Sequence, residues 1–172
     1  MTLIVKAGQQ LQPCVAEAEA DVSSAFAVAA LATVSGAAQV VNFPQHSRQP
    51  DHCFVAILQK MGVPIELSAH GLLVGKAERL LPISVNLGGA PDLTPVLAVL
   101  ASLAQGRSLL FGAPQLRGKE SDRIATTSAL LTTLGRKHTP REDGIEIEGQ
   151  PLTVSERSRP LRFDASGDHR LV

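Results

Sequence analysis

Two long apolar stretches of the chain share one layout. Residues 20–36, ADVSSAFAVAALATVSG, and residues 91–106, PDLTPVLAVLASLAQG, each have an aspartate and a hydroxyl residue able to cap a helix near the start, and each ends in glycine. Between these ends, apolar residues occupy all sides of a helix rather than one stripe. A helix that is apolar all round is typical of a protein interior. The pattern therefore predicts two buried helices.

The same series of shorter patterns follows each buried helix. A strand comes first, then a more amphipathic helix, then two short strands joined by a turn at His70-Gly71 or Asp143-Gly144. In the second amphipathic helix, Ile124, Leu131 and Leu134 lie on one face, and Gly135 follows the helix end. The predicted ranges are strands 37–43 and 107–113, helices 51–62 and 120–135, and strand pairs 64–75 and 137–149.

The two series repeat at a constant spacing. Asp21 and Asp92 are 71 residues apart, as are Asp51 and Asp122. A fixed period is the signature of structural repeats. The sequence therefore predicts an α+β fold of repeated βαβαββ units with buried apolar helices and outer sheets. We expect a single domain over residues 1–172, with units at about 12–82 and 83–158 and the start of a third at 159–172.

Both ends of the chain also carry strand predictions. The N-terminal residues 1–13, MTLIVKAGQQLQP, predict a strand and a turn. The tail 160–172, PLRFDASGDHRLV, predicts a strand followed by Asp168, which stands where Asp21 and Asp92 stand in the two units.

Composition narrows the classes of function. Hydrophobic residues make up 44% and charged residues 19%, as in a soluble globular chain. The 16 Lys and Arg balance the 16 Asp and Glu, and five Phe are the only aromatic residues, so we expect no nucleic-acid binding. The chain has neither a signal-peptide pattern nor an apolar run of about 20 residues. We therefore expect a cytoplasmic protein without membrane contact.

The cysteines and histidines give no sign of a metal site. Cys14 and Cys53 form no CxxC pair, and we expect them to be small buried or half-buried thiols in a reducing compartment. The five histidines are scattered without the spacing of metal ligands. We therefore predict no bound metal.

Charge is concentrated in residues 117–123, RGKESDR, where five of seven residues are charged. Lys119 and Arg123 are four residues apart, so they share one face of the predicted helix start. The first turn of a helix also offers free N–H groups and the positive end of the helix dipole, which suit an anionic ligand. The alternative is a solvated, salt-bridged helix start, in which each pair contributes about 0–1 kcal/mol.

Two other charged positions lie at comparable junctions. Asp92 precedes the second buried helix, and His169-Arg170 closes the tail. Each has an ordinary alternative: Asp92 as a residue near an N-cap, and GDHR as a surface turn. In stacked repeats, however, the strand-to-helix junctions gather at one end of the buried helices. We therefore expect these residues to converge with the 117–123 cluster.

Four segments in this order, DVSSAFAVAALA, PDLTPVLAVLASLAQG, LRGKESDRIATTSALLTTLG and DHR, closely resemble the C-terminal half of the EPSP synthase family. The resemblance runs from about Leu3 to Val172 and covers a little under half of the family's usual length. It implies a transferase that moves the enolpyruvyl group of phosphoenolpyruvate to the 5-hydroxyl of shikimate 3-phosphate and releases phosphate, with no metal or organic cofactor.

The resemblance also implies roles for individual residues. Asp92 and Glu120 would be the acid/base groups, with Asp92 also contacting the shikimate hydroxyls. Lys119 would contact the shikimate side and bridge toward the transferred group. The remaining positions are substrate-binding: Arg123 and Arg170 for the phosphate and carboxylate of phosphoenolpyruvate, His169 in support, and Gln115, where many members carry asparagine.

The family's N-terminal lysine-serine-arginine cluster and the rest of its other domain have no counterpart in these residues. The resemblance thus implies a partial enzyme that is inactive alone. The helices Ser23–Val34 and Leu93–Ala104 would expose apolar sides, so we expect contact with a missing N-terminal domain or self-association. One alternative is a non-catalytic binding or assembly module, though Asp92, Glu120 and Arg123 are all retained. Another is a transferase acting on a nucleotide sugar, which KESDR and DHR argue against.

Overall fold

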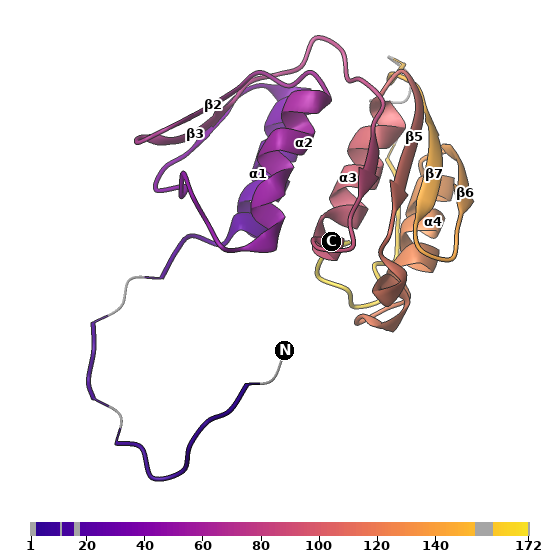
Figure 1. Cartoon of the computed structure of the whole chain (residues 1–172). Helices are drawn as coiled ribbons and strands as arrows, with labels where there is room; N and C mark the ends of the chain where they lie inside the picture. The colour runs from indigo at the N-terminus through magenta and orange to yellow at the C-terminus, as the bar shows by residue number, and fades with distance from the viewer. Residues whose placement is uncertain (1–2, 11, 16–17, 154–159, 172) are drawn as a thin grey trace.

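The computed structural model describes residues 3–10, 12–15, 18–153 and 160–171. Two sheets form the outer layers, and the helices α1 (Val22–Ser35) and α3 (Thr94–Leu103) lie between them and contact each other (Figure 1). The helix α2 (Phe54–Lys60) contacts α1 through the rings of Phe54 and Phe26, and α4 (Arg123–Thr133) packs on α3. The predicted α+β architecture, with repeated units, inner helices and outer sheets, is confirmed.

The first unit carries a three-stranded antiparallel sheet. Its strands are β1 (Ala38–Val40), β2 (Ile65–Ser68) and β3 (Gly71–Val74), in the order β1-β3-β2. Gly71, in the predicted turn, has φ +110°, and a Cβ there would collide with the carbonyl oxygen of Val40. Only glycine tolerates both conditions, so the turn holds the register of this sheet.

The second unit carries a four-stranded sheet in the order β4-β5-β7-β6. The strand β4 (Ser84–Asn86) pairs in parallel with β5 (Gly106–Phe111), and α3 forms the crossover between them. The strands β6 (Lys137–Pro140) and β7 (Ile145–Gly149) close the sheet as the predicted antiparallel pair. The described residues also form short 3-10 turns. The turn η1 (Pro50–Cys53) directly precedes α2, η2 (Pro91–Leu93) directly precedes α3, and η3 (Pro114–Gly118) lies between β5 and α4.

The strand predictions at the two ends of the chain are wrong. The described parts of residues 1–13 form exposed coil with a turn at Ala7-Gly8, and Figure 1 shows this segment extending away from the body. The described part of the tail, residues 160–171, contains turns and no strand. A strand needs a partner for its backbone groups, and the described residues of these two segments pair with no strand.

Burial of the inner helices is less complete than predicted. The ring centroids of Phe26 and Phe54 lie 5.2 Å apart in the core of the first unit. On the opposite side of α1, however, Val28 is 49% and Leu31 65% exposed. The prediction of a helix buried all round is therefore wrong for α1, whereas the expectation that the helix Ser23–Val34 exposes an apolar side is met.

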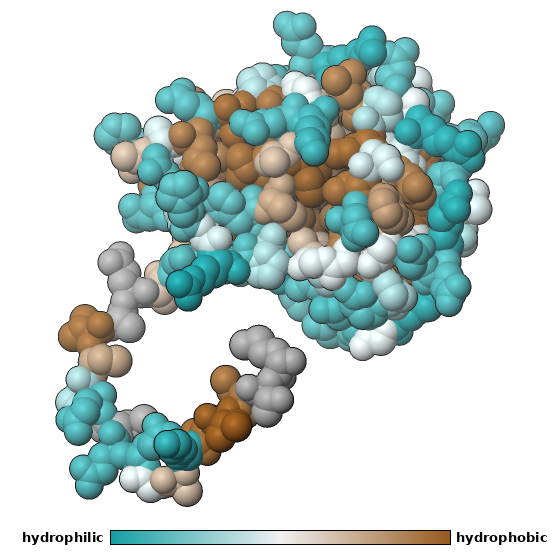
Figure 2. Space-filling model, viewed as in Figure 1, coloured by the Kyte–Doolittle hydropathy of each residue, from teal (hydrophilic) through white to brown (hydrophobic). Residues whose placement is uncertain are grey.

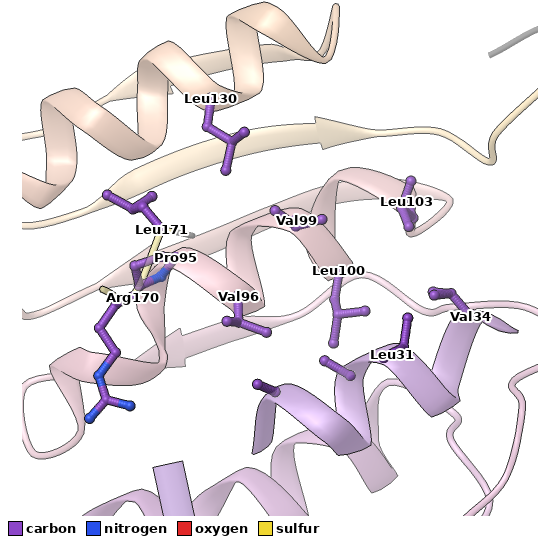
Figure 3. Close-up of a pocket in the computed structure, with 12 residues that line it drawn as sticks. Leu31, Val34, Pro95, Val96, Val99, Leu100, Leu103, Leu130, Arg170 and Leu171 are labelled. Carbon is purple, nitrogen blue, oxygen red and sulfur yellow. The ribbon is translucent and has the colours of Figure 1, made fainter. Parts of the chain in front are cut away.

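An apolar groove runs along this uncovered side. It has a volume of about 290 Å³, and Figure 3 shows its side chains converging from α1, α3 and α4. We call it the interhelical groove; its lining consists of Ala27, Ala30, Leu31, Val34, Pro95, Val96, Val99, Leu100, Leu103, Leu130, Arg170 and Leu171. Figure 2 shows an apolar surface in the middle of the face in view, between the two halves of the molecule.

Both cysteines are exposed and unpaired, so the prediction of buried or half-buried thiols is wrong. Cys14 lies in the extended N-terminal segment, and Cys53 is the last residue of η1. Among the described helices, none combines the length and the apolar character needed to cross a membrane.

Candidate active site

Arg123 is the centre of the charged cluster. It is the first residue of α4, and its side chain is only 1% exposed. Its Nε donates to Asp168 Oδ2 at 2.8 Å and its Nη1 to Asp92 Oδ1 at 2.9 Å. Its Nη2 donates to Glu120 Oε2 at 2.6 Å and to Asp168 Oδ1 at 3.1 Å. Four hydrogen bonds to three carboxylates thus fix the guanidinium and compensate its burial.

Asp168 is the partner that holds Arg123 with both carboxylate oxygens. It is fully buried and also accepts hydrogen bonds from Ser121 Oγ at 2.9 Å and the backbone N–H of Arg170 at 3.0 Å. Burial raises the pKa of Asp168, but the hydrogen bonds from Arg123, Arg170 and Ser121 outweigh it and lower the pKa to about 2. Asp168 therefore stays ionised at any physiological pH.

Asp168 was not among the predicted site residues. Two signals pointed to it: its position in GDHR, directly before two predicted site residues, and its repeat position, which matches that of Asp92. The partner, Arg123, lies 45 residues away in sequence, so no local pattern connects the two.

Asp92 faces three cations. Its Oδ1 lies 3.1 Å from Lys119 Nζ and 2.9 Å from Arg123 Nη1, and its Oδ2 lies 3.5 Å from Arg170 Nη2. Partial burial raises the pKa of Asp92, but Lys119, Arg123 and Arg170 together lower it below the ordinary value. Asp92 directly precedes Leu93, the N-cap of α3, but it lies inside η2 and its side chain does not cap the helix.

Glu120 and His169 form the exposed edge of the cluster. The side chains are 50% and 62% exposed, and Glu120 Oε1 lies 3.8 Å from His169 Nδ1. Glu120 is also the most exposed partner of Arg123. It is therefore the carboxylate of the three that can move with least rearrangement.

Lys119 and Arg170 are the accessible cations. Their side chains are 32% and 22% exposed, against 1% for Arg123. The Nε of Arg170 is buried and has no hydrogen-bond partner among the described residues. An anionic oxygen that reached this N–H would satisfy it.

Gln115 and Arg117 have local roles in η3. The Gln115 Nε2 donates to the Gly88 carbonyl at 2.9 Å, which ties η3 to the loop before η2. Arg117 donates to the carbonyl oxygens of Arg141 and Glu142 and pairs with Asp122 at 3.0 Å. The alternative of a solvated, salt-bridged helix start thus describes Arg117 and Asp122 well. It does not describe Arg123, whose side chain is buried, or Lys119, whose partner Asp92 lies outside the segment.

The structure brings six of the seven predicted site residues together: Asp92, Lys119, Glu120, Arg123, His169 and Arg170. Gln115 lies in η3, shortly before Lys119, and its amide donates to the Gly88 carbonyl instead of pointing to these six residues. In the part of the chain that is described, no group of three or more His, Cys, Asp and Glu residues is arranged to hold a metal ion. The arrangement offers accessible cations for an anion next to ionised carboxylates able to accept a proton.

Comparison with known proteins extends over the whole chain. The family model described as EPSP synthase (3-phosphoshikimate 1-carboxyvinyltransferase) matches residues 1–172. The 3-phosphoshikimate 1-carboxyvinyltransferase of Methanobrevibacter smithii is 39% identical over 165 residues, 95% of this chain and 36% of the relative. That of Halobacterium salinarum is 35% identical over 174 residues, 98% of this chain and 40% of the relative. The chain thus spans less than half the length of these relatives.

Solved structures agree with this match. EPSP synthase from Acinetobacter baumannii superposes with a TM-score of 0.60 and 28% identity, covering 76% of this chain and 32% of that one. The enolpyruvyl transferase NikO from Streptomyces tendae superposes with a TM-score of 0.57 over 75% of this chain and 30% of that one. At 15% identity, this second likeness concerns the fold alone.

Proposed function

The chain belongs to the EPSP synthase family, and on this premise we propose that it forms one wall of the active site of an enolpyruvyl transferase. The substrates are phosphoenolpyruvate and shikimate 3-phosphate, and the products are the enolpyruvyl ether and inorganic phosphate. The observation that carries the proposal is the convergence of Lys119, Arg170, Asp92 and Glu120 from the second unit and the tail.

The proposed reaction has an addition and an elimination. The 5-hydroxyl oxygen bonds to C2 of phosphoenolpyruvate, its proton passes to a carboxylate, and C3 gains a proton. Loss of a proton from C3 and cleavage of the C2–O bond to phosphate then complete the transfer. Asp92, ionised among its cations, suits the acceptor of the hydroxyl proton, and the more exposed Glu120 suits the exchange at C3.

The cations bind the anionic groups. Lys119 and Arg170 contact the phosphate or carboxylate directly, because they are the accessible ones. Arg123 reaches the anion after Glu120 moves aside, and His169 supports Glu120 at the rim. Gln115 supplies a hydrogen bond to a substrate hydroxyl after release from Gly88.

The chain alone provides one wall, so we propose that it binds substrate weakly and is inactive without a further segment that closes the cleft. A cytoplasmic location also stays a prediction. The family resemblance supports a partial enzyme over a non-catalytic module, because Asp92, Glu120 and Arg123 are all retained.

Titration of the ¹⁵N-labelled chain with each substrate tests the proposal. We expect amide shifts around residues 92, 119–123 and 168–170, with dissociation constants on the order of 1 mM. Lys119→Ala and Arg170→Ala should each weaken binding about tenfold, since each removes a charge-assisted contact. Lys137→Ala, an exposed charge on β6, is the matched control and should change nothing.

Phosphate release by the chain with both substrates should stay at the uncatalysed rate. Turnover without any other polypeptide would refute the proposed inactivity. No amide shift with either substrate at 10-fold the expected constant, roughly 10 mM, or shifts confined to a remote surface, would refute the proposed site.

A further inference from the structure

A second polar group faces the site from the first unit. Its centre is Asp51, which is 8% exposed and lies in η1. Ser23, in the first turn of α1, donates its Oγ hydrogen to Asp51 Oδ2 at 2.5 Å. The other carboxylate oxygen, Oδ1, has no hydrogen-bond partner among the described residues. Because Asp51 lines a pocket, this oxygen can accept a hydrogen bond from a ligand there.

The side chain of Gln49 fixes the positions of Ser23 and Asp51. Gln49 accepts a hydrogen bond from the backbone N–H of Val22 at 3.0 Å and donates to the Ala20 carbonyl at 2.9 Å. It also donates to Glu19 Oε2 at 3.0 Å. The amide of Gln49 is therefore fully used in holding the start of α1 against η1. Ser23 and Asp51 are thereby held in place relative to each other.

Asp51 shares a pocket with the cluster of the second unit. The pocket has a volume of about 290 Å³, and its polar lining includes Ser23 and Asp51 from the first unit and Asp92 and Lys119 from the second. Asp92 already has three cationic partners, whereas Asp51 has no ion pair among the described residues. The two groups of lining residues thus differ in chemistry: Lys119 offers positive charge, and Asp51 offers only an acceptor.

This asymmetry selects the ligand. A free anion is attracted by Lys119 but repelled by Asp51, and a free cation is repelled by Lys119. A neutral hydroxyl is a good donor to an ionised carboxylate and brings no charge of its own. The complement of the whole pocket is therefore a compound with both an anionic group and hydroxyl groups.

We propose that Ser23 and Asp51 form a hydroxyl-binding subsite for the acceptor substrate, with Asp51 Oδ1 accepting a ligand O–H while Lys119 binds the ligand's charged side. The inference rests on the proposed function and deepens it, because it extends substrate recognition to residues of the first unit. Ser23 orients the Asp51 carboxylate, and Asp51 makes the ligand contact.

The test compares two probes on the same variants. Shikimate 3-phosphate carries hydroxyls and a phosphate, whereas inorganic phosphate carries the anion alone. Asp51→Asn keeps the shape and the acceptor for Ser23, but it replaces the free carboxylate oxygen with an amide donor. We expect about tenfold weaker binding of shikimate 3-phosphate and unchanged or tighter binding of phosphate in ¹⁵N titrations. Ser23→Ala should weaken shikimate 3-phosphate binding about threefold without changing phosphate binding.

Glu148→Gln, which removes a charge from the exposed side of β7, is the control for net charge and should leave both titrations unchanged. If Asp51→Asn leaves shikimate 3-phosphate binding intact, or weakens both probes equally, the subsite is wrong and the proposed function stands. If the unmodified chain binds neither probe near Lys119, the subsite and the proposed function both fail.

Discussion

Arg123 keeps its charge with 1% of its side chain exposed because three carboxylates surround it. Burial lowers the pKa of Arg123, but the contacts with Asp168, Asp92 and Glu120 raise it above the ordinary value. A buried ion pair of this kind adds little compared with an apolar core, but removing one partner leaves an uncompensated charge. The cluster is therefore sensitive to single substitutions.

Asp168→Asn should lower the free energy of unfolding at pH 7 by about 3 kcal/mol, because the buried Arg123 loses its two-oxygen partner and keeps Asp92 and Glu120. Urea unfolding measures the loss. Asp164→Asn, on an exposed residue of the same tail, should cost less than about 0.5 kcal/mol.

The same variant should change the dependence of stability on pH. The pKa of Asp168 falls from an ordinary 3.8 to about 2 on folding, so its stabilisation is complete above about pH 4 and is lost as the pH falls toward 2. This loss amounts to about 2 kcal/mol in the unmodified chain and should be missing in Asp168→Asn. Parallel stability curves between pH 4 and pH 2 would contradict the assignment.

At the scale of elements, four aspartates at the helix starts divide into two kinds. Asp21 and Asp122 are N-caps: each accepts hydrogen bonds from two backbone N–H groups of α1 or α4. Asp51 and Asp92 lie within the 3-10 turns η1 and η2 and make no cap. In both of these turns a proline precedes the aspartate. The proline starts the turn one residue before the aspartate, so the carboxylate lies inside the turn and not at the capping position.

This division limits what the repeat could predict. The period of 71 residues pairs Asp21 with Asp92 and Asp51 with Asp122, yet each pair contains one cap and one pocket residue. The existence of the helices and most strands followed from hydrophobic period and turn residues. The side-chain roles did not, because they depend on a one-residue shift at a proline and on partners 27 to 78 residues away.

Asp122→Ala should lower the free energy of unfolding by about 1 kcal/mol, because two N–H groups at the start of α4 lose their acceptor. Asp122→Asn is the matched control and should retain most of the stability, since asparagine caps as well as aspartate. Equal losses in the two variants, measured by urea unfolding, would indicate instead that the ion pair with Arg117 dominates.

At the scale of the whole molecule, the interhelical groove leaves apolar side chains of α1 and α3 facing solvent. Sequence periodicity predicted these apolar sides, and the structure places them along one groove with Leu31 65% exposed. Sequence periodicity does not identify the partner that covers the groove. Self-association through it stays a prediction.

Leu31→Glu should shift the chain toward monomer in sedimentation velocity at high concentration, because the charge would be buried in any apolar contact at the groove. Leu73→Glu is the matched control: Leu73 is 44% exposed, but it lies on β3 outside the groove. A chain that is monomeric at all concentrations before substitution, or an equal shift in both variants, would contradict association through this face.

The tail that carries Asp168 and Arg170 has one more consequence, for the order of folding. The pairs within the second sheet join residues 5 to 43 apart, whereas Asp168 reaches Arg123 across 45 residues and Arg170 reaches Asp92 across 78. Longer loops cost more entropy to close, and residues 160–171, the described part of the tail, form no strand to guide it. The charged cluster is therefore completed after the sheet, so the kinetics of ligand binding during refolding should lag behind the appearance of secondary structure.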